Sequence, residues 1–151
     1  MGENLLGSQI VCQVGIIVRD VEKVARTWAT ILGVEPPVAH LTDGVDIAHT
    51  CYHGKPTEAR AKLAFFNLGQ VSLELIEPVG GPSTWQEFLD AHGQGLHHIA
   101  FLIQGMDEVI ARLEVYDVPL VQRGDYTGGR YAYLDGIAGL GAIVELLENL
   151  K

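Results

Sequence analysis

The chain has 151 residues, of which 48% are hydrophobic and 19% are charged. This length suits one compact domain, or two small modules that share a core, and the composition excludes intrinsic disorder. The 10 Lys and Arg residues against 19 Asp and Glu give a formal net charge of -9. Because the basic residues are scattered, no stripe could neutralise a run of phosphates, and nucleic-acid binding is not expected.

The first residues and the lengths of the apolar runs predict the cellular location of the protein. The opening sequence MGENLLGSQIVCQVG lacks a basic segment and a small-residue cleavage site, which predicts a cytoplasmic protein. Charged residues interrupt the apolar runs well before the ~18 consecutive apolar residues of a membrane span, so no membrane crossing is expected. Cys12 and Cys51 lack CxxC spacing, and we expect both to be reduced thiols.

The chain repeats itself once. Residues 12–28, CQVGIIVRDVEKVARTW, align without a gap on residues 97–113, HHIAFLIQGMDEVIARL. Each copy begins with the alternation of a strand and changes to the period of a helix, and Gly33 is expected to end the first helix. A later strand also recurs, as VSLELIE at 71–77 and AIVELLE at 142–148.

Between helix and last strand, each copy has room for two more strands. We expect these around Val45–Tyr52 and Lys62–Asn67 in the first copy, and near Val118–Gln122 and Tyr131–Leu134 in the second. The order is therefore βαβββ, twice. The sequence predicts an α+β fold in which the two modules form a curved mixed sheet with a central cleft.

One domain is expected over residues 10–148, with module one at about 10–80 and module two at about 95–148. A helix at about 83–92, STWQEFLDAH, links them and starts at an N-cap, Ser83. The loop at 38–60 is longer than its counterpart in the second copy. It is a candidate lid or dimer-contact segment, and it holds His40, His49, His53 and Lys55.

Four polar residues interrupt the strands at equivalent positions of the repeat. Gln13 aligns with His98, and Glu74 aligns with Glu145. Strand alternation places all four on the face opposite the apolar side chains that pack against the helices. These helix-facing side chains are expected to be Val14, Ile16, Val18, Leu73, Leu75, Ile99, Phe101, Ile103, Val144 and Leu146.

The four side chains form a candidate metal site. A carboxylate in the middle of an apolar strand is costly to desolvate unless a cation compensates it. Gln13, Glu74, His98 and Glu145 supply three oxygens and one nitrogen from one side, which leaves two positions open for water or substrate. This mixed set suits one divalent ion, Zn²⁺, Co²⁺, Ni²⁺ or Mn²⁺, without choosing between them.

Each residue also has a simpler interpretation. Gln13 alone is typical of a solvated strand position, and His98 alone of a hydrogen-bonded core histidine. Glu74 and Glu145 can face solvent, as we expect of two other glutamates, Glu77 and Glu148, near the strand ends. His97 is expected on the opposite face of its strand. The joint pattern of four polar residues on one face favours the metal site.

Paired βαβββ modules with one polar ligand from the first and the last strand of each module resemble the vicinal oxygen chelate superfamily. This superfamily includes glyoxalases, methylmalonyl-CoA epimerases, extradiol dioxygenases and bleomycin-resistance proteins. The resemblance covers about residues 11–148, and its most specific segments look like methylmalonyl-CoA epimerase: AFFNLGQVSLELIEP, GLHHIAF and AIVELLE. It implies the same ligand set, Gln13, Glu74, His98 and Glu145.

The chain also departs from these relatives. Epimerases usually have histidine where this chain has Gln13, and the Gln/Glu/His/Glu set is similar to that of eukaryotic glyoxalase I. The positions that recognise glutathione there hold Ile17 and Pro78 here, and the epimerase FLHPK-like segment is replaced by YLDGIAG at 133–139. Dioxygenases need two histidines and a carboxylate, a triad that Gln13 breaks.

The resemblance implies a metal-dependent isomerase, epimerase or lyase that abstracts a proton next to a carbonyl. Glu145, or Glu74 across the cleft, is the candidate base, and epimerase-like chemistry is favoured over glyoxalase-like chemistry. The expected partner is a small molecule with a carbonyl or thioester, and a homodimer is expected. The two alternatives are a glyoxalase I-like lyase on a hemithioacetal and a metal-free protein that binds or sequesters a small molecule.

Overall fold

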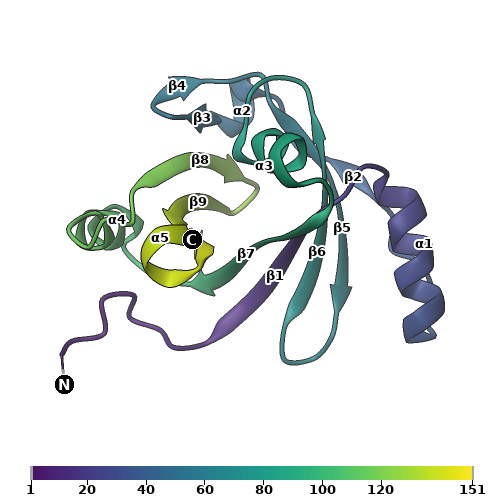
Figure 1. Cartoon of the computed structure of the whole chain (residues 1–151), viewed down its shortest axis with the longest axis horizontal. Helices are drawn as coiled ribbons and strands as arrows, with labels where there is room; N and C mark the ends of the chain where they lie inside the picture. The colour runs from purple at the N-terminus through teal and green to yellow at the C-terminus, as the bar shows by residue number, and fades with distance from the viewer. Residues whose placement is uncertain (1, 151) are drawn as a thin grey trace.

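The computed structural model describes residues 2–150, and these form an α+β fold built on one curled mixed sheet (Figure 1). The ten strands lie in the order β2-β5-β6-β1-β7-β10-β9-β8-β3-β4. The strands are β1 (Val11–Ile17), β2 (His40–Leu41), β3 (Cys51–Tyr52), β4 (Lys55–Pro56), β5 (Arg60–Asn67), β6 (Ser72–Val79), β7 (Gly95–Leu102), β8 (Leu120–Tyr126), β9 (Gly129–Gly136) and β10 (Ala142–Asn149). The helices are α1 (Val21–Leu32), α2 (Val45–Ala48), α3 (Thr84–His92), α4 (Met106–Glu114) and α5 (Ile137–Leu140).

The two halves of the sheet have the same strand order. In the first half, β1 runs parallel to β6, β6 antiparallel to β5, and β5 antiparallel to β2. In the second half, β7 runs parallel to β10, β10 antiparallel to β9, and β9 antiparallel to β8. The first strands of the halves, β1 and β7, pair antiparallel and join the halves into one sheet. The strands with the repeated polar residues therefore lie together at its centre.

One end of α1 and the start of α3 lie where the sequence predicts, at Gly33 and Ser83. The Asp20 side chain caps α1 by accepting from the backbone N–H of Lys23, and Gly33 ends the helix in the left-handed conformation, with φ 70°. The Ser83 hydroxyl caps α3 by accepting from the backbone N–H of Gln86, at 2.9 Å. Both caps satisfy N–H groups that a helix leaves without an internal partner.

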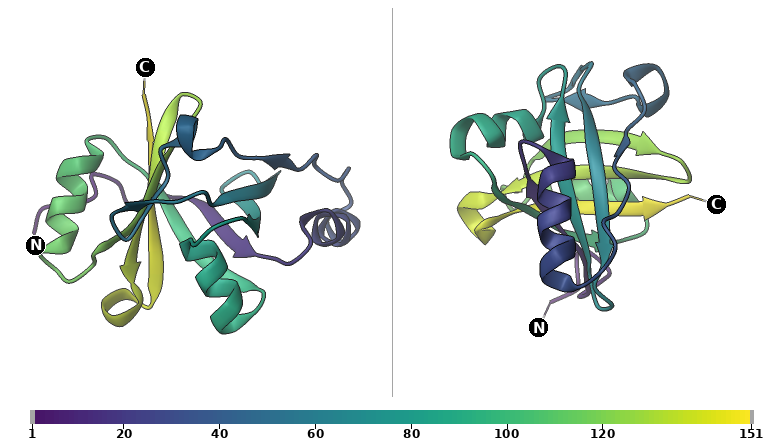
Figure 2. Two further views of the ribbon diagram at one scale, coloured as in Figure 1. Left: turned by 90° about the horizontal axis from the view of Figure 1, so that it is seen from above. Right: turned by 90° about the vertical axis from the view of Figure 1, so that its right-hand side faces the viewer.

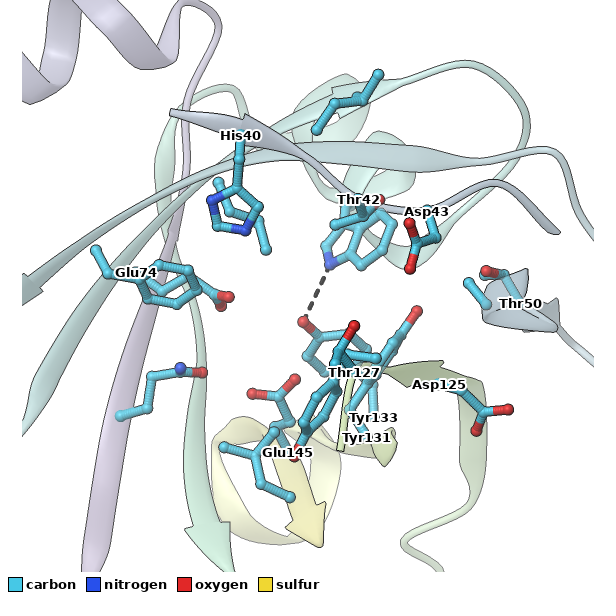
Figure 3. Close-up of a pocket in the computed structure, with 18 residues that line it drawn as sticks. His40, Thr42, Asp43, Thr50, Glu74, Asp125, Thr127, Tyr131, Tyr133 and Glu145 are labelled. Carbon is cyan, nitrogen blue, oxygen red and sulfur yellow. Dashed lines mark hydrogen bonds between the residues drawn. The ribbon is translucent and has the colours of Figure 1, made fainter. Parts of the chain in front are cut away.

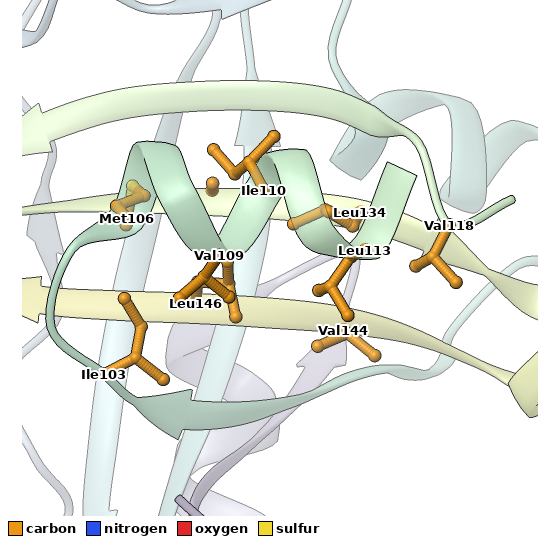
Figure 4. Close-up of a cluster of buried hydrophobic side chains, with 10 residues drawn as sticks. Ile103, Met106, Val109, Ile110, Leu113, Val118, Leu134, Val144 and Leu146 are labelled. Carbon is orange, nitrogen blue, oxygen red and sulfur yellow. The ribbon is translucent and has the colours of Figure 1, made fainter. Parts of the chain in front are cut away.

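Two apolar cores lie on the helix-covered face of the sheet, and α1 and α4 stand at opposite ends of the molecule (Figure 2). Under α1, Val21, Ala25 and Ala29 pack against Leu73 and Leu75. The larger core lies under α4 (Figure 4) and contains Ile103, Met106, Val109, Ile110, Leu113, Val118, Ala132, Leu134, Val144 and Leu146. The predicted helix face of the strands is confirmed for the residues in these cores, which leaves the opposite face for the site.

Two glutamates expected to face solvent instead cap the helices. Glu77 Oε1 accepts from the backbone N–H of Val21 at 2.9 Å. At the equivalent place in the second half, Glu148 accepts from the N–H groups of Gly105 and Met106, at 2.6 and 3.3 Å. The expectation was wrong because the last strand of each half ends beside the N-terminus of that half's helix, where a carboxylate is favourable.

The segment 38–60 differs from its prediction. The strand expected at Val45–Tyr52 is absent: Val45–Ala48 is helix α2, and the second strand of this half is the two-residue β2. Cys51–Tyr52 (β3) leaves its own half and pairs with β8 of the other half. The segment therefore crosses from one end of the curled sheet to the other, as Figure 1 shows. On the way, the Tyr52 hydroxyl donates a hydrogen bond to Glu87 of α3.

None of the helices within residues 2–150 has both the length and the apolar character required to span a bilayer.

Candidate metal centre

The structure brings the four predicted side chains together around one atom, His98 Nε2. Glu145 Oε1 lies 3.1 Å from this nitrogen, Gln13 Oε1 lies 3.3 Å from it, and Glu74 Oε1 lies 3.5 Å from it. The residues come from β6, β1, β7 and β10, which are consecutive neighbours in the sheet. Because the side chains leave the same face of adjacent strands, they converge although the residues are far apart in the sequence.

The cluster is buried and holds two carboxylates close to one imidazole. Glu74, His98 and Glu145 are only 6%, 3% and 3% exposed. Glu74 Oε1 and Glu145 Oε1 have no hydrogen-bond partner among the described residues. Burial, and then the charge of Glu145, raise the pKa of Glu74 well above its ordinary value. Two carboxylates in this position are costly unless a cation lies between them.

The donor atoms are spaced as the ligands of one ion would be. Ligand atoms about 2.0–2.2 Å from a shared divalent ion, at tetrahedral or octahedral angles, lie roughly 2.8–3.6 Å from each other. The three distances from His98 Nε2, 3.1, 3.3 and 3.5 Å, fall in this range. The Glu74, His98 and Glu145 donor atoms all lie within 4.8 Å of one another. The residues present therefore fit a metal ion.

His98 is oriented by its neighbour in the chain. His97 Nδ1 lies 2.9 Å from His98 Nδ1, and His97 Nε2 lies 3.1 Å from the Thr84 hydroxyl. Burial, and then the nearby His98, lower the pKa of His97 well below its ordinary value, so His97 stays neutral. When His98 Nδ1 carries the proton and donates it to His97 Nδ1, His98 Nε2 presents a free electron pair to the cluster.

The contact between these two rings corrects the expectation that His97 faces away from the site. The register of β1 against β7 changes at this point: Gly15 pairs with His98, but the next residue, Ile16, pairs with Leu96. This irregularity breaks the simple alternation of side chains. No local sequence signal marks it, because it depends on the pairing of two distant strands.

The cluster opens into a cavity of about 480 Å³ (Figure 3). Gln13, Glu74 and Glu145 form part of its wall, while His98 lies behind them. The cavity is also lined by His40, Leu41, Thr42, Asp43, Ala48, Thr50, Leu63, Phe65, Trp85, Asp125, Tyr126, Thr127, Tyr131, Tyr133 and Leu147. Six of these lie in the segment 38–60, which therefore forms one wall of the cavity. The role of this segment in dimer contact stays a prediction.

Aromatic residues that the sequence interpretation missed form the wall next to Glu145. Trp85 Nε1 donates a hydrogen bond to the Tyr133 hydroxyl at 3.1 Å, and Gln122 Nε2 donates one to the Tyr131 hydroxyl at the same distance. Burial, and then the charges of Glu145 and Glu74, raise the pKa of Tyr133 well above its ordinary value. Both tyrosines lie in β9, where the sequence predicted a strand but no part of the site.

The structure also places the other candidates. His40 lines the cavity and stacks on Phe65. His49 pairs with Asp125 at 2.8 Å on the surface. Neither residue belongs to the group of donor atoms around His98 Nε2.

Comparison with known proteins identifies the family of the chain. The model of the glyoxalase/bleomycin resistance protein/dioxygenase superfamily matches residues 12–133. The chain belongs to this superfamily. The family that the sequence resembles is therefore confirmed, together with the fold that the resemblance implies.

The chain is similar to one curated protein in sequence and to several solved structures in fold. The uncharacterized protein YqjC of Bacillus subtilis is 39% identical over 94 residues, which cover 60% of this chain and 67% of that protein. A methylmalonyl-CoA epimerase from Mycobacterium tuberculosis superposes with a TM-score of 0.68 at 21% identity, over 100% of this chain and 93% of that chain. A Streptomyces coelicolor methylmalonyl-CoA epimerase in complex with 2-nitronate-propionyl-CoA gives 0.66 at 22% identity, over 94% and 98%. At this identity, the two epimerases show a shared fold.

Proposed function

We propose that the chain is a metal-dependent enzyme that abstracts a proton from the carbon next to a substrate carbonyl, as an epimerase or isomerase does. One observation carries the proposal: two buried carboxylates, whose Oε1 atoms have no hydrogen-bond partner within residues 2–150, converge with an imidazole and an amide oxygen at the wall of a substrate-sized cavity. A cavity that served only to hold a small molecule would gain nothing from this costly arrangement.

Gln13, Glu74, His98 and Glu145 would hold one divalent ion. When bound there, the ion polarises the carbonyl oxygen of the substrate and so makes the neighbouring C–H group more acidic. The donor set of three oxygens and one nitrogen is compatible with Zn²⁺, Co²⁺, Ni²⁺ or Mn²⁺.

Glu145 and Glu74 are the proposed proton-transfer residues. They project from β10 and β6, on either side of the central pair β1 and β7, and the Oε1 atom of each has no hydrogen-bond partner in the described part of the chain. In this proposal Glu145 takes the proton, and Glu74 faces the reacting carbon from the other side. Carboxylates on two sides can remove a proton from one face and return it to the other, which supports epimerisation over a lyase reaction.

The lining of the cavity supports a small carbonyl compound or the acyl end of a thioester. Leu63, Phe65 and Leu147 provide apolar surface, and the charged side chains along the described lining are acidic, Asp43 and Asp125 besides the cluster. The phosphates of an acyl-CoA would therefore lie outside the cavity. The Streptomyces epimerase binds such a CoA derivative.

A second candidate is a glyoxalase-type lyase acting on a hemithioacetal. It is favoured by the Gln13 amide oxygen, which faces His98 Nε2 and completes the Gln/Glu/His/Glu set. Isomerisation of the hemithioacetal of methylglyoxal, followed spectroscopically, separates this candidate from the epimerase.

The test combines two measurements on the purified protein. Elemental analysis should find about one divalent ion per chain, and NMR in D₂O should detect exchange of the α-proton in a panel of acyl-CoAs and 2-oxo compounds. Exchange that is abolished by chelator and restored by metal supports the proposal. A protein that binds these compounds without metal or exchange is a sequestering protein instead. Analytical ultracentrifugation of the same sample tests the expected homodimer.

A further inference from the structure

The hydroxyl of Tyr133 is held inside the cavity but takes no part in the metal cluster. Trp85 Nε1 donates to it at 3.1 Å, the bond drawn as a dashed line in Figure 3. An indole N–H can only donate, so the hydroxyl is the acceptor and its own hydrogen points elsewhere. Within residues 2–150, no protein group accepts that hydrogen.

The Tyr133 ring is fixed by packing. The side chain is only 2% exposed. Its ring meets Trp85 edge-on at 6.1 Å between centroids, and it lies 5.2 Å from the His97 ring and 5.0 Å from the His98 ring. Because the ring is held on three sides, its hydroxyl has one position. A hydrogen bond from this hydroxyl to a substrate therefore costs little additional conformational entropy.

The pairing of strands places this hydroxyl beside the proposed base. Tyr133 on β9 is the direct partner of Glu145 on β10. Directly opposed residues of an antiparallel pair project their side chains to the same face of the sheet. Figure 3 shows both side chains entering the cavity from the same wall.

We propose that Tyr133 is a catalytic residue that donates a hydrogen bond to the substrate carbonyl oxygen as this oxygen becomes negatively charged. The inference rests on the proposed function. In the step, the Cα–H bond breaks, the proton goes to a carboxylate, and the electron pair forms the carbon–carbon double bond of an enolate. Negative charge then arrives on the oxygen, while the hydroxyl keeps its own proton. Trp85 is a positioning residue, since it acts by holding that hydroxyl.

The first test is α-proton exchange by Tyr133→Phe, which keeps the ring and its packing. Removing a prearranged donor to a developing oxyanion lowers kcat by about 10²–10³-fold, and we expect a loss of this size with unchanged metal content. Trp85→Phe should lower kcat less and leave KM nearly unchanged. Tyr116→Phe is the matched control, because Tyr116 is 67% exposed and lies outside the cavity lining.

The second test measures binding without turnover. Calorimetry compares 2-nitronate-propionyl-CoA, which carries negative charge where an enolate does, with propionyl-CoA, which does not. Tyr133→Phe should weaken the nitronate about tenfold or more and propionyl-CoA less than threefold, because only the charged oxygen gains from the donor. A purely structural role would weaken both ligands alike.

Three results overturn the assignment. They are exchange by Tyr133→Phe within threefold of the wild type, equal weakening of the two ligands, and wild-type protein that binds the nitronate no more tightly than propionyl-CoA. If the wild type neither holds metal nor exchanges an α-proton, the proposed function itself fails, and the role of Tyr133 fails with it. An active wild type beside an equally active Tyr133→Phe rejects Tyr133 alone.

Discussion

The imidazole of His98 lies directly against the α-carbon of Gly15 on the neighbouring strand. The two residues are partners across β1 and β7. A β-carbon added to Gly15 would overlap the imidazole and would lie 2.6 Å from Nε2, the atom on which the cluster converges. Gly15 is thus required by the close approach of a side chain, and its backbone needs no left-handed conformation.

Gly15→Ala should therefore damage the site. The added methyl group forces the His98 ring away from Glu145 and Glu74, and overpacking of this kind costs about 1–3 kcal/mol of stability. We expect the variant to lose most of its metal, by elemental analysis, with a lowered Tm. Gly139→Ala is the control, because a β-carbon there meets no atom within 4 Å. Normal metal content in Gly15→Ala would contradict the observed packing.

Substitutions at the cluster should separate metal binding from proton transfer. His98→Ala removes the central nitrogen, so both metal and α-proton exchange should be lost. Glu145→Gln keeps an oxygen ligand but cannot accept a proton, so exchange should fall far more than metal content. Glu74→Gln is measured alongside. If Glu145→Gln exchanges at the wild-type rate while Glu74→Gln does not, Glu74 is the base.

The centre of the fold and the cluster could be predicted because the information is local and repeated. Alternation within β6 or β10, whose pairing with β5 and β9 has no register shift, fixes the face to which each side chain points. The equivalence of Gln13 with His98, and of Glu74 with Glu145, then indicated that the four strands belong together. The distances from His98 Nε2 to the other three side chains could be learned only from the structure.

What could not be predicted depends on contacts between distant segments. β3 is two residues long and pairs with β8 of the other half, so its own sequence carries no strand period. The irregular register at His97 arises only when β7 meets β1. Glu77 and Glu148 were expected to be exposed because the backbone N–H groups that they bind, at the starts of α1 and α4, are distant in sequence.

Thr84 should influence the metal through two histidines. Its hydroxyl lies 3.1 Å from His97 Nε2, and His97 in turn orients His98. Thr84→Val keeps the shape but leaves the buried His97 N–H without an acceptor. Loss of such an outer partner typically weakens metal binding about 10–100-fold, which competition with a chromogenic chelator can measure. Thr27→Val, on the exposed face of α1, is the control for this substitution. Equal metal affinities in the two variants would show that Thr84 does not act on the metal through His97 and His98.

Glu148 should stabilise the second half in a pH-dependent way. Burial raises the pKa of this carboxyl, but the hydrogen bonds from Arg130, Gly105 and Met106 outweigh burial, and the net pKa is lowered. A carboxyl with a lowered folded pKa contributes its full stability above its unfolded pKa of ~4.3, and this contribution is lost as the pH falls through the folded pKa.

Glu148→Gln should therefore lower the free energy of unfolding by about 1–3 kcal/mol at pH 7, because the charge-assisted hydrogen bonds to Arg130 and to the start of α4 are lost. Urea denaturation checks this value. At pH 3 the wild-type carboxyl is closer to protonation, so the gap between wild type and variant should narrow. Glu114→Gln, on the exposed face of α4, should change stability by less than about 0.5 kcal/mol at both pH values. A gap that stays the same from pH 7 to pH 3 would show that packing, and not the charge of Glu148, holds this end of the helix.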